Sequence, residues 1–407
     1  MKDIRASGSP AGEPAIFVDR EEELSLILNP VCRGEGSLLN FYGVAGIGKT
    51  RLLQEAYRKA ADLAQPPPRY FVDLKDLPNR PEGPSMALLN LLSDALAQSP
   101  QPPSPDELSL ARHEPAALVR FSLRREGPLL LLFDSTEVLQ ADRVFWRWAE
   151  DHVIGPLVLS ERAILVFAGR SPVNWQRFEV RRAVTLHELH PLGEPFANEH
   201  IENELIRHGP TSVPSDLSPL VKIVYDLAQG HPLAEEEAAA YAAAHLDKAL
   251  GNPDAFRIPL SQNVVTRIVD DYLLQGVKAP WSDVIKRACI LRQFDALMLE
   301  RFLRRAAPDL AGERDEGFFV EGLRTLRNAH LVTWKAELGY YLHDLLREIM
   351  TRHLELSVPD LFRDAHHHAA EMYEELAEEC ADEEEKKRYL NEAKYHREWA
   401  SSEAKEG

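Results

Sequence analysis

One octapeptide of the chain has the residue types and the spacing of a phosphate-binding loop. Gly43-Val44-Ala45-Gly46-Ile47-Gly48-Lys49-Thr50 fits the pattern G-x-x-x-x-G-K-[ST]. The glycines of such a loop let backbone N–H groups surround the phosphates of a nucleoside triphosphate, at the positive end of the following helix. We expect the ammonium of Lys49 to lie between the β- and γ-phosphates and the hydroxyl of Thr50 to ligate Mg²⁺.

The segments on either side of the loop indicate the strand and the helix that such a loop requires. Leu38–Tyr42 is an apolar run typical of a buried strand, and residues 50–56 are typical of the start of a helix. A chance glycine-rich turn is the alternative, and the agreement of strand, loop and helix argues against it. The residues assigned to nucleotide contact in this segment are Gly46, Ile47, Gly48, Lys49, Thr50 and Arg51.

A second motif for the same chemistry follows further along the chain. The run Leu129–Phe133 is entirely apolar, as a central parallel strand covered on both faces must be, and Asp134 follows it. Because the carboxyl end of such a strand lies beside the phosphate loop, we assign Asp134 to Mg²⁺ together with Thr50. An ordinary aspartate at a strand end is the alternative.

Hydrolysis of a bound nucleotide needs a carboxylate that positions the attacking water. Many ATPases carry an acidic residue directly after the strand-ending aspartate, whereas this chain has Ser135. Glu137 is the candidate for the role, and a plain surface position is the open alternative. The sequence therefore predicts an ATPase with slow turnover.

An arginine follows the next predicted strand. The apolar run Ala163–Ala168 is followed by Gly169 and Arg170. An arginine at that strand end points toward the γ-phosphate and is a candidate sensor of it, with a charged strand cap as the alternative. The catalytic assignments are thus Lys49, Asp134, Glu137 and Arg170.

The composition favours a globular protein of several domains and argues against nucleic-acid binding. The chain has 407 residues, 44% of them hydrophobic, and a formal net charge of −18. That charge repels the phosphate backbone of DNA and RNA, so we expect no nucleic-acid partner. The chain has no long apolar run and no apolar signal region at its start, which predicts a cytoplasmic protein without a membrane span. Its three cysteines are too scattered to indicate a disulfide framework or a zinc site.

Alternating strand-like and helical patterns divide the chain into an α/β region and a helical region. Residues 16–195 predict a P-loop nucleotide-binding domain with a parallel sheet flanked by helices. Residues 196–258 predict an all-helical lid subdomain. Residues 259–355 have the order of a winged-helix domain, in which short helices precede a β-hairpin. The further expected elements are strands at 70–74 and 182–186 and helices at 196–208, 217–229 and 232–250.

The two ends of the chain have compositions of their own. Residues 1–15 predict a flexible tail, and residues 356–407 predict an acidic helical hairpin with seven basic and fifteen acidic residues. That hairpin resembles either a linker or the opening of a tetratricopeptide-like array that stops early. His366, His367 and His368 are adjacent on one predicted helix, so they face different directions and are not expected to hold one metal ion.

Several motifs in order resemble those of one known family. The motifs are Phe17–Leu24 (F-V-D-R-E-E-E-L), the phosphate loop, Gly169-Arg170, Gly230–Ala234 (G-H-P-L-A) and Leu342–Leu345 (L-H-D-L). From about residue 16 to 355 the chain resembles STAND-class NTPases of the NB-ARC type, which are AAA+-related signalling ATPases. Two positions depart from the family pattern: Asp19 stands where glycine is usual, and Leu342 stands where methionine is usual.

The resemblance implies contacts to the nucleotide from outside the phosphate loop. Val18 and Arg20 are implied to border the adenine and Pro232 to pack on it, while His343 is implied to contact the β-phosphate of ADP. Taken alone, Gly230-His231-Pro232 is also a plain helix stop and restart, and His343 is equally a surface or core histidine.

The resemblance also implies a nucleotide-gated switch. ADP holds the domains closed, exchange for ATP with Mg²⁺ releases the winged helix, and the activated protein self-associates. The family usually carries an effector domain and a repeat array, for which this sequence leaves little room. We therefore expect either a core excised from a longer protein or a component with an unidentified sensor or effector partner at the C-terminal helices.

A DNA-binding AAA+-like ATPase or transcription regulator is the alternative, because winged helices usually read DNA. Residues 260–355 contain fourteen basic and fourteen acidic residues, and the helix predicted before the hairpin carries Arg324 and Arg327 against two glutamates. A DNA-reading helix normally presents a basic face. The equal numbers of basic and acidic residues therefore favour a winged helix that contacts the bound nucleotide within the protein over one that reads DNA.

Overall fold

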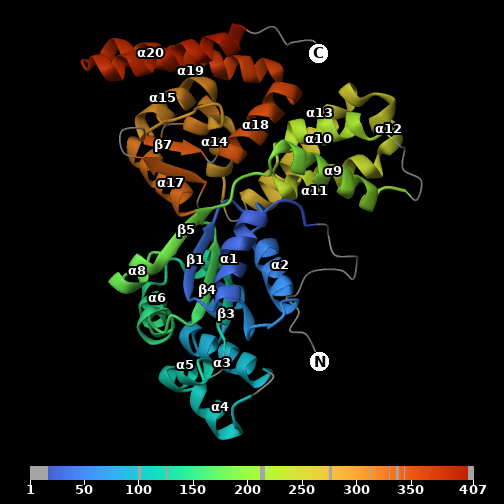
Figure 1. Cartoon of the computed structure of the whole chain (residues 1–407). Helices are drawn as coiled ribbons and strands as arrows, with labels where there is room; N and C mark the ends of the chain where they lie inside the picture. Colours follow the sequence, from blue (N-terminus) through green and yellow to red (C-terminus); the bar gives the residue numbers. More distant parts are fainter. Residues whose placement is uncertain are drawn as a thin grey trace. The chain divides into compact units, whose positions relative to one another are not determined.

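The chain folds into two compact units, unit 1 over Met1–His190 and unit 2 over Pro191–Gly407. The structure is a computed structural model, shown in Figure 1. It describes residues 17–99, 102–124, 127–210, 216–274, 277–312, 314–329, 331–335, 339–342 and 344–401. The finer division into lid, winged-helix and hairpin segments remains a prediction.

A five-stranded parallel sheet forms the centre of unit 1, as the sequence predicts (Figure 1). The strand order is β2-β3-β4-β1-β5. The strands are β1 (Ser37–Tyr42), β2 (Arg69–Asp73), β3 (Leu129–Asp134), β4 (Ala163–Gly169) and β5 (Val184–Glu188). Because every pairing is parallel, the carboxyl ends of all the strands lie at one edge of the sheet.

Helices cover both faces of this sheet, and the side chains of β3 alternate between them. Leu130 and Leu132 pack in the core formed with α1 and α2, whereas Leu131 and Phe133 pack in the core on the opposite face. An all-apolar run in the sequence is therefore a strand buried on both sides. The helices are α1 (Glu21–Arg33), α2 (Lys49–Ala61), α3 (Pro84–Ala97), α4 (Pro105–Ala111), α5 (Pro115–Ser122), α6 (Arg143–Ala149), α7 (Gly155–Leu159) and α8 (Phe178–Ala183), with short turns η1 (Leu74–Asn79), η2 (Thr136–Leu139) and η3 (Glu150–Ile154).

The fifth strand differs from its predicted position. The sequence predicts a strand at 182–186, but α8 continues to Ala183 and β5 begins at Val184. β5 is an edge strand with partly exposed side chains. It lacks the unbroken apolar run that locates the central strands in a sequence.

Unit 2 begins with five helices, and the structure divides one predicted helix in two. These helices are α9 (Glu194–His208), α10 (Ser218–Ala228), α11 (Pro232–Ala244), α12 (Leu246–Gly251) and α13 (Pro253–Val264), and the π-helical turn η4 (Val265–Leu273) follows. The single helix predicted at 232–250 breaks at His245, whose ring Nδ1 lies 2.9 Å from the Tyr241 carbonyl oxygen. A continuing α-helix would bond that oxygen to the His245 N–H, which instead donates to Ala242.

Three helices and a β-hairpin form the next part of unit 2. They are α14 (Trp281–Ala288), α15 (Ala296–Ala306), α17 (Glu316–Asn328), β6 (Val332–Lys335) and β7 (Gly339–Leu342), with the short α16 (Pro308–Ala311) between α15 and α17. The strands β6 and β7 pair antiparallel. Phe294 extends this pairing, because its N–H donates to the Tyr340 carbonyl at 2.8 Å and its carbonyl oxygen accepts the Tyr340 N–H at 2.7 Å.

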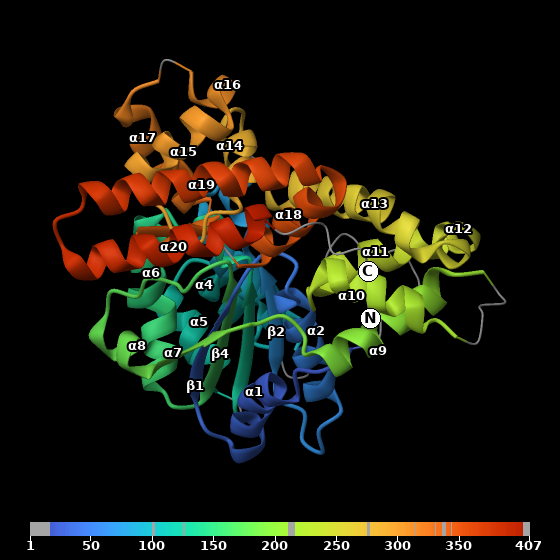
Figure 2. The same cartoon turned by 90° about the horizontal axis from the view of Figure 1, so that it is seen from above.

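The chain ends in three helices, α18 (Asp344–Ser357), α19 (Pro359–Glu379) and α20 (Glu383–Ser401). α19 and α20 lie antiparallel and side by side in both views (Figures 1 and 2). The hydroxyl of the buried Tyr373 donates to the Gln293 carbonyl at 2.7 Å, and Arg292 makes a two-pronged ion pair with Glu392. These contacts fasten the hairpin to the segment that precedes α15.

Across the part of the chain that the structure describes, no helix combines the length and the apolar character that crossing a membrane requires.

Candidate functional site

The loop from Gly43 to Thr50 connects β1 to α2 at the carboxyl edge of the sheet. Gly46 and Gly48 have φ angles of 79° and 97°, which side chains rarely permit. Ile47 is fully buried in the core and anchors the loop, while Gly48 caps the first turn of α2. The backbone curves into a phosphate-binding loop here because the glycines allow positive φ angles and the buried Ile47 packs the loop against the core.

The side chain of Lys49 lies inside this loop. Its Nζ donates to the carbonyl oxygens of Gly43 at 2.8 Å and Val44 at 2.6 Å. Burial lowers the pKa of Lys49 to about 8, and the nearby charges of Glu137 and Asp134 partly oppose that effect. The site thus holds a desolvated ammonium close to two carboxylates.

The side chains of Thr50 and Asp134, both assigned to Mg²⁺ from the sequence, are in direct contact. The Thr50 hydroxyl donates to Oδ2 of Asp134 at 2.7 Å, and the Ser135 N–H donates to Oδ1 at 2.9 Å. Burial raises the pKa of the Asp134 carboxyl, and these two hydrogen bonds act against it. A hydroxyl and a carboxylate are hard oxygen donors of the kind that Mg²⁺ takes, so these residues fit the ion.

Glu137 and Arg170 belong to the same group of side chains. Oε2 of Glu137 is buried without a hydrogen-bond partner among the described residues, and the charge of Arg170 acts on the pKa of Lys49. Gly169 permits this approach, because a Cβ there would lie 1.9 Å from Oγ1 of Thr136 and 3.2 Å from Oε2 of Glu137. The end of β4 and the turn after β3 are therefore in direct contact.

The segment before α1 has an unusual backbone. Asp19 and Arg20 have φ angles of 59° and 75°, in the left-handed region. Glycine adopts this region most easily, and aspartate tolerates it better than most other residues, which fits Asp19 at this position. Arg20 is buried and donates to Glu23 and to the carbonyl of His190, while Val18 is half-buried beside it.

Of the remaining assignments, Arg51 is on α2, Pro232 is in unit 2 and His343 is not described. Arg51 is half-buried on α2; the pKa of Glu55 is lowered mainly by the hydrogen bond from Arg58, and the charge of Arg51 adds to this effect. Pro232 begins α11 in unit 2, next to His231, whose Nδ1 accepts the Ala234 N–H at 3.2 Å. His343 lies outside the described residues. The nucleotide contacts proposed for Pro232 and His343 remain predictions.

Two polar residues near the site escaped the sequence analysis. Asp73 ends β2 in register with Asp134 on β3, and its charge contributes to the raised pKa of Asp134. Asn40 is fully buried on β1 and accepts the Val173 N–H at 2.8 Å, which holds the loop after β4. The signal for Asp73 was an aspartate next to the last residue of the strand predicted at 70–74, but only the strand order brings it to Asp134.

The parallel sheet, the glycine loop and the paired Thr50 and Asp134 define the fold of a P-loop NTPase. No family model and no curated protein matches the chain. Among solved structures, it is similar to a Walker-type ATPase of Pyrococcus abyssi, with 14% identity and a TM-score of 0.55 over 83% of this chain and 96% of that one. It is also similar to the ORC2 protein of Aeropyrum pernix in its ADP form, with 16% identity and a TM-score of 0.52 over 84% and 95% of the two chains.

Proposed function

We propose that the protein binds an adenine nucleotide with Mg²⁺ in the phosphate loop and hydrolyses ATP slowly. The observation that carries this proposal is the convergence of Lys49, Thr50 and Asp134 at one strand edge. An ammonium inside a ring of backbone groups suits phosphate oxygens, and the hydroxyl and carboxylate suit the metal ion. Mg²⁺ bound there supplies positive charge that offsets the charge of the phosphates.

Each charged residue of the site then has a role. Lys49 exchanges its contacts to the Gly43 and Val44 carbonyls for phosphate oxygens. The unpaired Oε2 of Glu137 accepts a hydrogen bond from the attacking water. Arg170 contacts the γ-phosphate, the group that distinguishes ATP from ADP.

Slow turnover is supported by the residue that follows Asp134. Ser135 is buried, has a φ of 63° and uses its N–H to hold the Asp134 carboxylate. It offers no second carboxylate at the position where many ATPases have one. Glu137 must act from a turn further on, which suits a regulatory ATPase better than a fast motor.

We further propose that the bound nucleotide sets the arrangement and the self-association of the protein, as in the STAND family that its motifs resemble. The left-handed backbone at Asp19 and Arg20 supports this, because it matches the glycine of the family motif. Mass in solution, measured with ADP and with a nonhydrolysable ATP analogue, tests the proposal. We expect a monomer with ADP and a larger species with the analogue; equal masses in both states would contradict the switch.

A DNA-binding ATPase is the second candidate, supported by the arrangement of α14, α15, α17 and the β-hairpin. Three helices followed by the two-stranded hairpin, with one further backbone bridge at Phe294, support a winged helix here. The charges of α17 weigh against DNA, because Arg324 is paired with Glu321. Salt-dependent binding of duplex DNA that Arg324→Glu/Arg327→Glu abolishes, and that Lys387→Glu on α20 leaves intact, would favour this candidate.

A further inference from the structure

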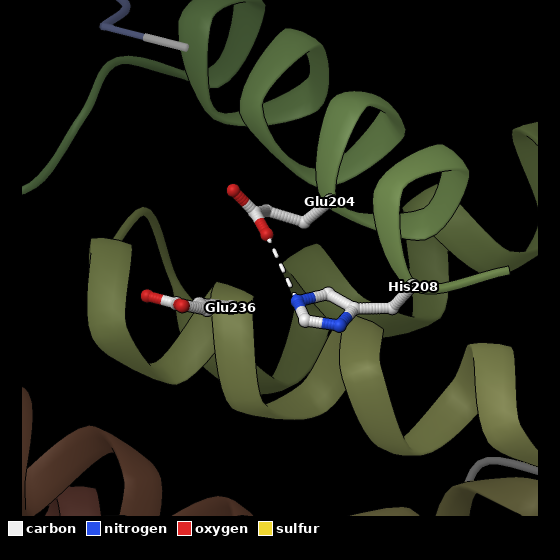
Figure 3. A group of neighbouring side chains, drawn as sticks. All are labelled: Glu204, His208 and Glu236. Carbon is white, nitrogen blue, oxygen red and sulfur yellow. Dashed lines mark ion pairs between the residues drawn. The ribbon is translucent and has the colours of Figure 1, made fainter. Parts of the chain in front are cut away.

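A second group of ligand-type side chains lies in unit 2, between α9 and α11 (Figure 3). Its members are Glu204 and His208 on α9 and Glu236 on α11. One carboxylate oxygen or ring nitrogen from each lies within 4.8 Å of the others. No step of the proposed nucleotide chemistry uses these residues.

The geometry of Glu204 and His208 is that of two ligands of one ion. They are four residues apart on one helix, so their side chains lie on the same face. Nε2 of His208 is 3.2 Å from Oε2 of Glu204. Bonds of about 2.0–2.1 Å to a tetrahedral ion place neighbouring ligand atoms about 3.3 Å apart. This pair therefore needs almost no movement to bind a metal.

Glu204 is buried beside a second histidine. Its side chain is 3% exposed, and Nε2 of His200 lies 4.0 Å from its other oxygen, Oε1, which is beyond hydrogen-bond distance. Nδ1 of His200 lies 2.8 Å from Oε2 of the buried Glu235, which fixes the imidazole ring. His200 therefore lies on the Oε1 side of Glu204, and Oε2 is the oxygen that faces His208.

Arg207 already offsets part of the negative charge of this group. Its Nη1 lies 3.2 Å from Oε2 of Glu204 and 3.8 Å from Oε1 of Glu236. The side chain is 39% exposed, so it is free to swing into solvent when a second cation arrives. Arg207 therefore competes with a metal for the same two carboxylates.

We propose that Glu204, His208 and Glu236 bind one divalent transition-metal ion of the zinc type, which links α9 to α11. One imidazole nitrogen and two carboxylate oxygens suit Zn²⁺, and three protein ligands leave a fourth position for water. His208 and Glu236 are partly exposed, which gives the ion a path from solvent. The site is independent of the nucleotide proposal, because none of its ligands belongs to unit 1.

Zinc titration of the full chain, freed of metal and nucleotide, tests the site by competition with a fluorescent zinc indicator. We expect one Zn²⁺ per chain in the wild type and affinity at least tenfold weaker in His208→Ala and in Glu236→Gln. Both positions are partly exposed, so these variants should fold. The matched control Glu202→Gln, an exposed position on α9, should bind as the wild type does.

Two further measurements distinguish Zn²⁺ binding at this site from non-specific binding of Zn²⁺ to the protein surface. Arg207→Gln should bind Zn²⁺ more tightly than the wild type, because the competing cation is gone. Saturating Zn²⁺ should raise the melting temperature of the wild type but not that of His208→Ala. Equal zinc affinity in the wild type, His208→Ala and Glu236→Gln would overturn the proposal, as would an equal thermal shift in the wild type and His208→Ala.

Discussion

Two of the regions that contain buried bases have different surroundings, the phosphate loop and the α19–α20 hairpin. Lys49 in the phosphate loop lies near the carboxylates of Glu137 and Asp134 and donates to loop carbonyls. His366 and His396 in the α19–α20 hairpin lie 2.8 Å apart between their Nδ1 atoms, and aromatic rings surround them. Burial alone therefore does not mark a binding site. A stronger indication of a binding site is a set of opposite charges that lies beside backbone polar groups at the carboxyl end of the strands.

The largest effect expected in the loop region comes from removing the proposed metal ligand. Asp134→Asn should lower steady-state ATP hydrolysis about 100-fold or more, because the site loses the carboxylate that we propose for Mg²⁺. The control Asp62→Asn, 69% exposed after α2, should hydrolyse as the wild type does. Hydrolysis unchanged in Asp134→Asn would place the activity elsewhere.

Glu137→Gln should slow hydrolysis about tenfold to 100-fold while ATP binding stays within a factor of about three. The amide keeps the shape of the side chain but cannot accept a proton from water. Asp73→Asn, the other carboxylate beside Asp134, is the comparison variant. If Asp73→Asn slows hydrolysis and Glu137→Gln does not, the assignment of Glu137 is wrong.

In the hairpin region, the expected effects are on stability alone. Tyr373→Phe leaves the Gln293 carbonyl without its hydrogen bond and should reduce the free energy of unfolding by about 1–2 kcal/mol. Nucleotide affinity should not change. Chemical denaturation and nucleotide titration of the same variant check both statements. A change in nucleotide affinity would contradict the prediction that the hairpin contributes to stability alone.

The last expected effect is a pH dependence of the stability of the hairpin. Burial lowers the pKa of His366 to about 4 and that of His396 to about 2, below the unfolded value of about 6.5. Between pH 6.5 and about 4 the unfolded chain binds protons that the folded chain does not. Stability should therefore fall as the pH drops through this window, by about 1 kcal/mol per pH unit for each histidine.

Urea unfolding at pH 7 and pH 5.5 measures this dependence. His366→Phe/His396→Leu should reduce the pH dependence without reversing its sign, since carboxylates elsewhere also titrate. An identical pH dependence in the wild type and the double variant would remove the histidine pair from the account.

Local sequence signals predicted most of unit 1. The loop at Gly43–Thr50 and the strand ending at Asp134 follow from residue spacing and apolar runs, which are local properties. Asp73 and Asn40 could not be found this way, because their partners depend on strand order and register between distant segments. The break at His245 was missed for a different reason, because there a local contact of the side chain to the Tyr241 carbonyl competes with helix propensity.

The proposed metal-ligating group in unit 2 could not be predicted from the sequence either. Glu204 and His208 have a readable helical spacing, but Glu236 joins them only when α9 packs on α11. The only histidine cluster considered from the sequence as a metal site was the run His366, His367 and His368, which was not expected to hold one ion. Of these, His366 is buried against His396, whereas His367 and His368 are partly exposed near Glu371.

Binding of fluorescent ADP and ATP analogues to the wild type and to Lys49→Ala, with and without Mg²⁺, tests the central claim most directly. We predict Mg²⁺-dependent binding of both nucleotides by the wild type and affinity weaker by on the order of 10–100-fold in Lys49→Ala. The exposed control Lys75→Ala should bind as the wild type does. Equal affinities in the wild type and Lys49→Ala would contradict the account.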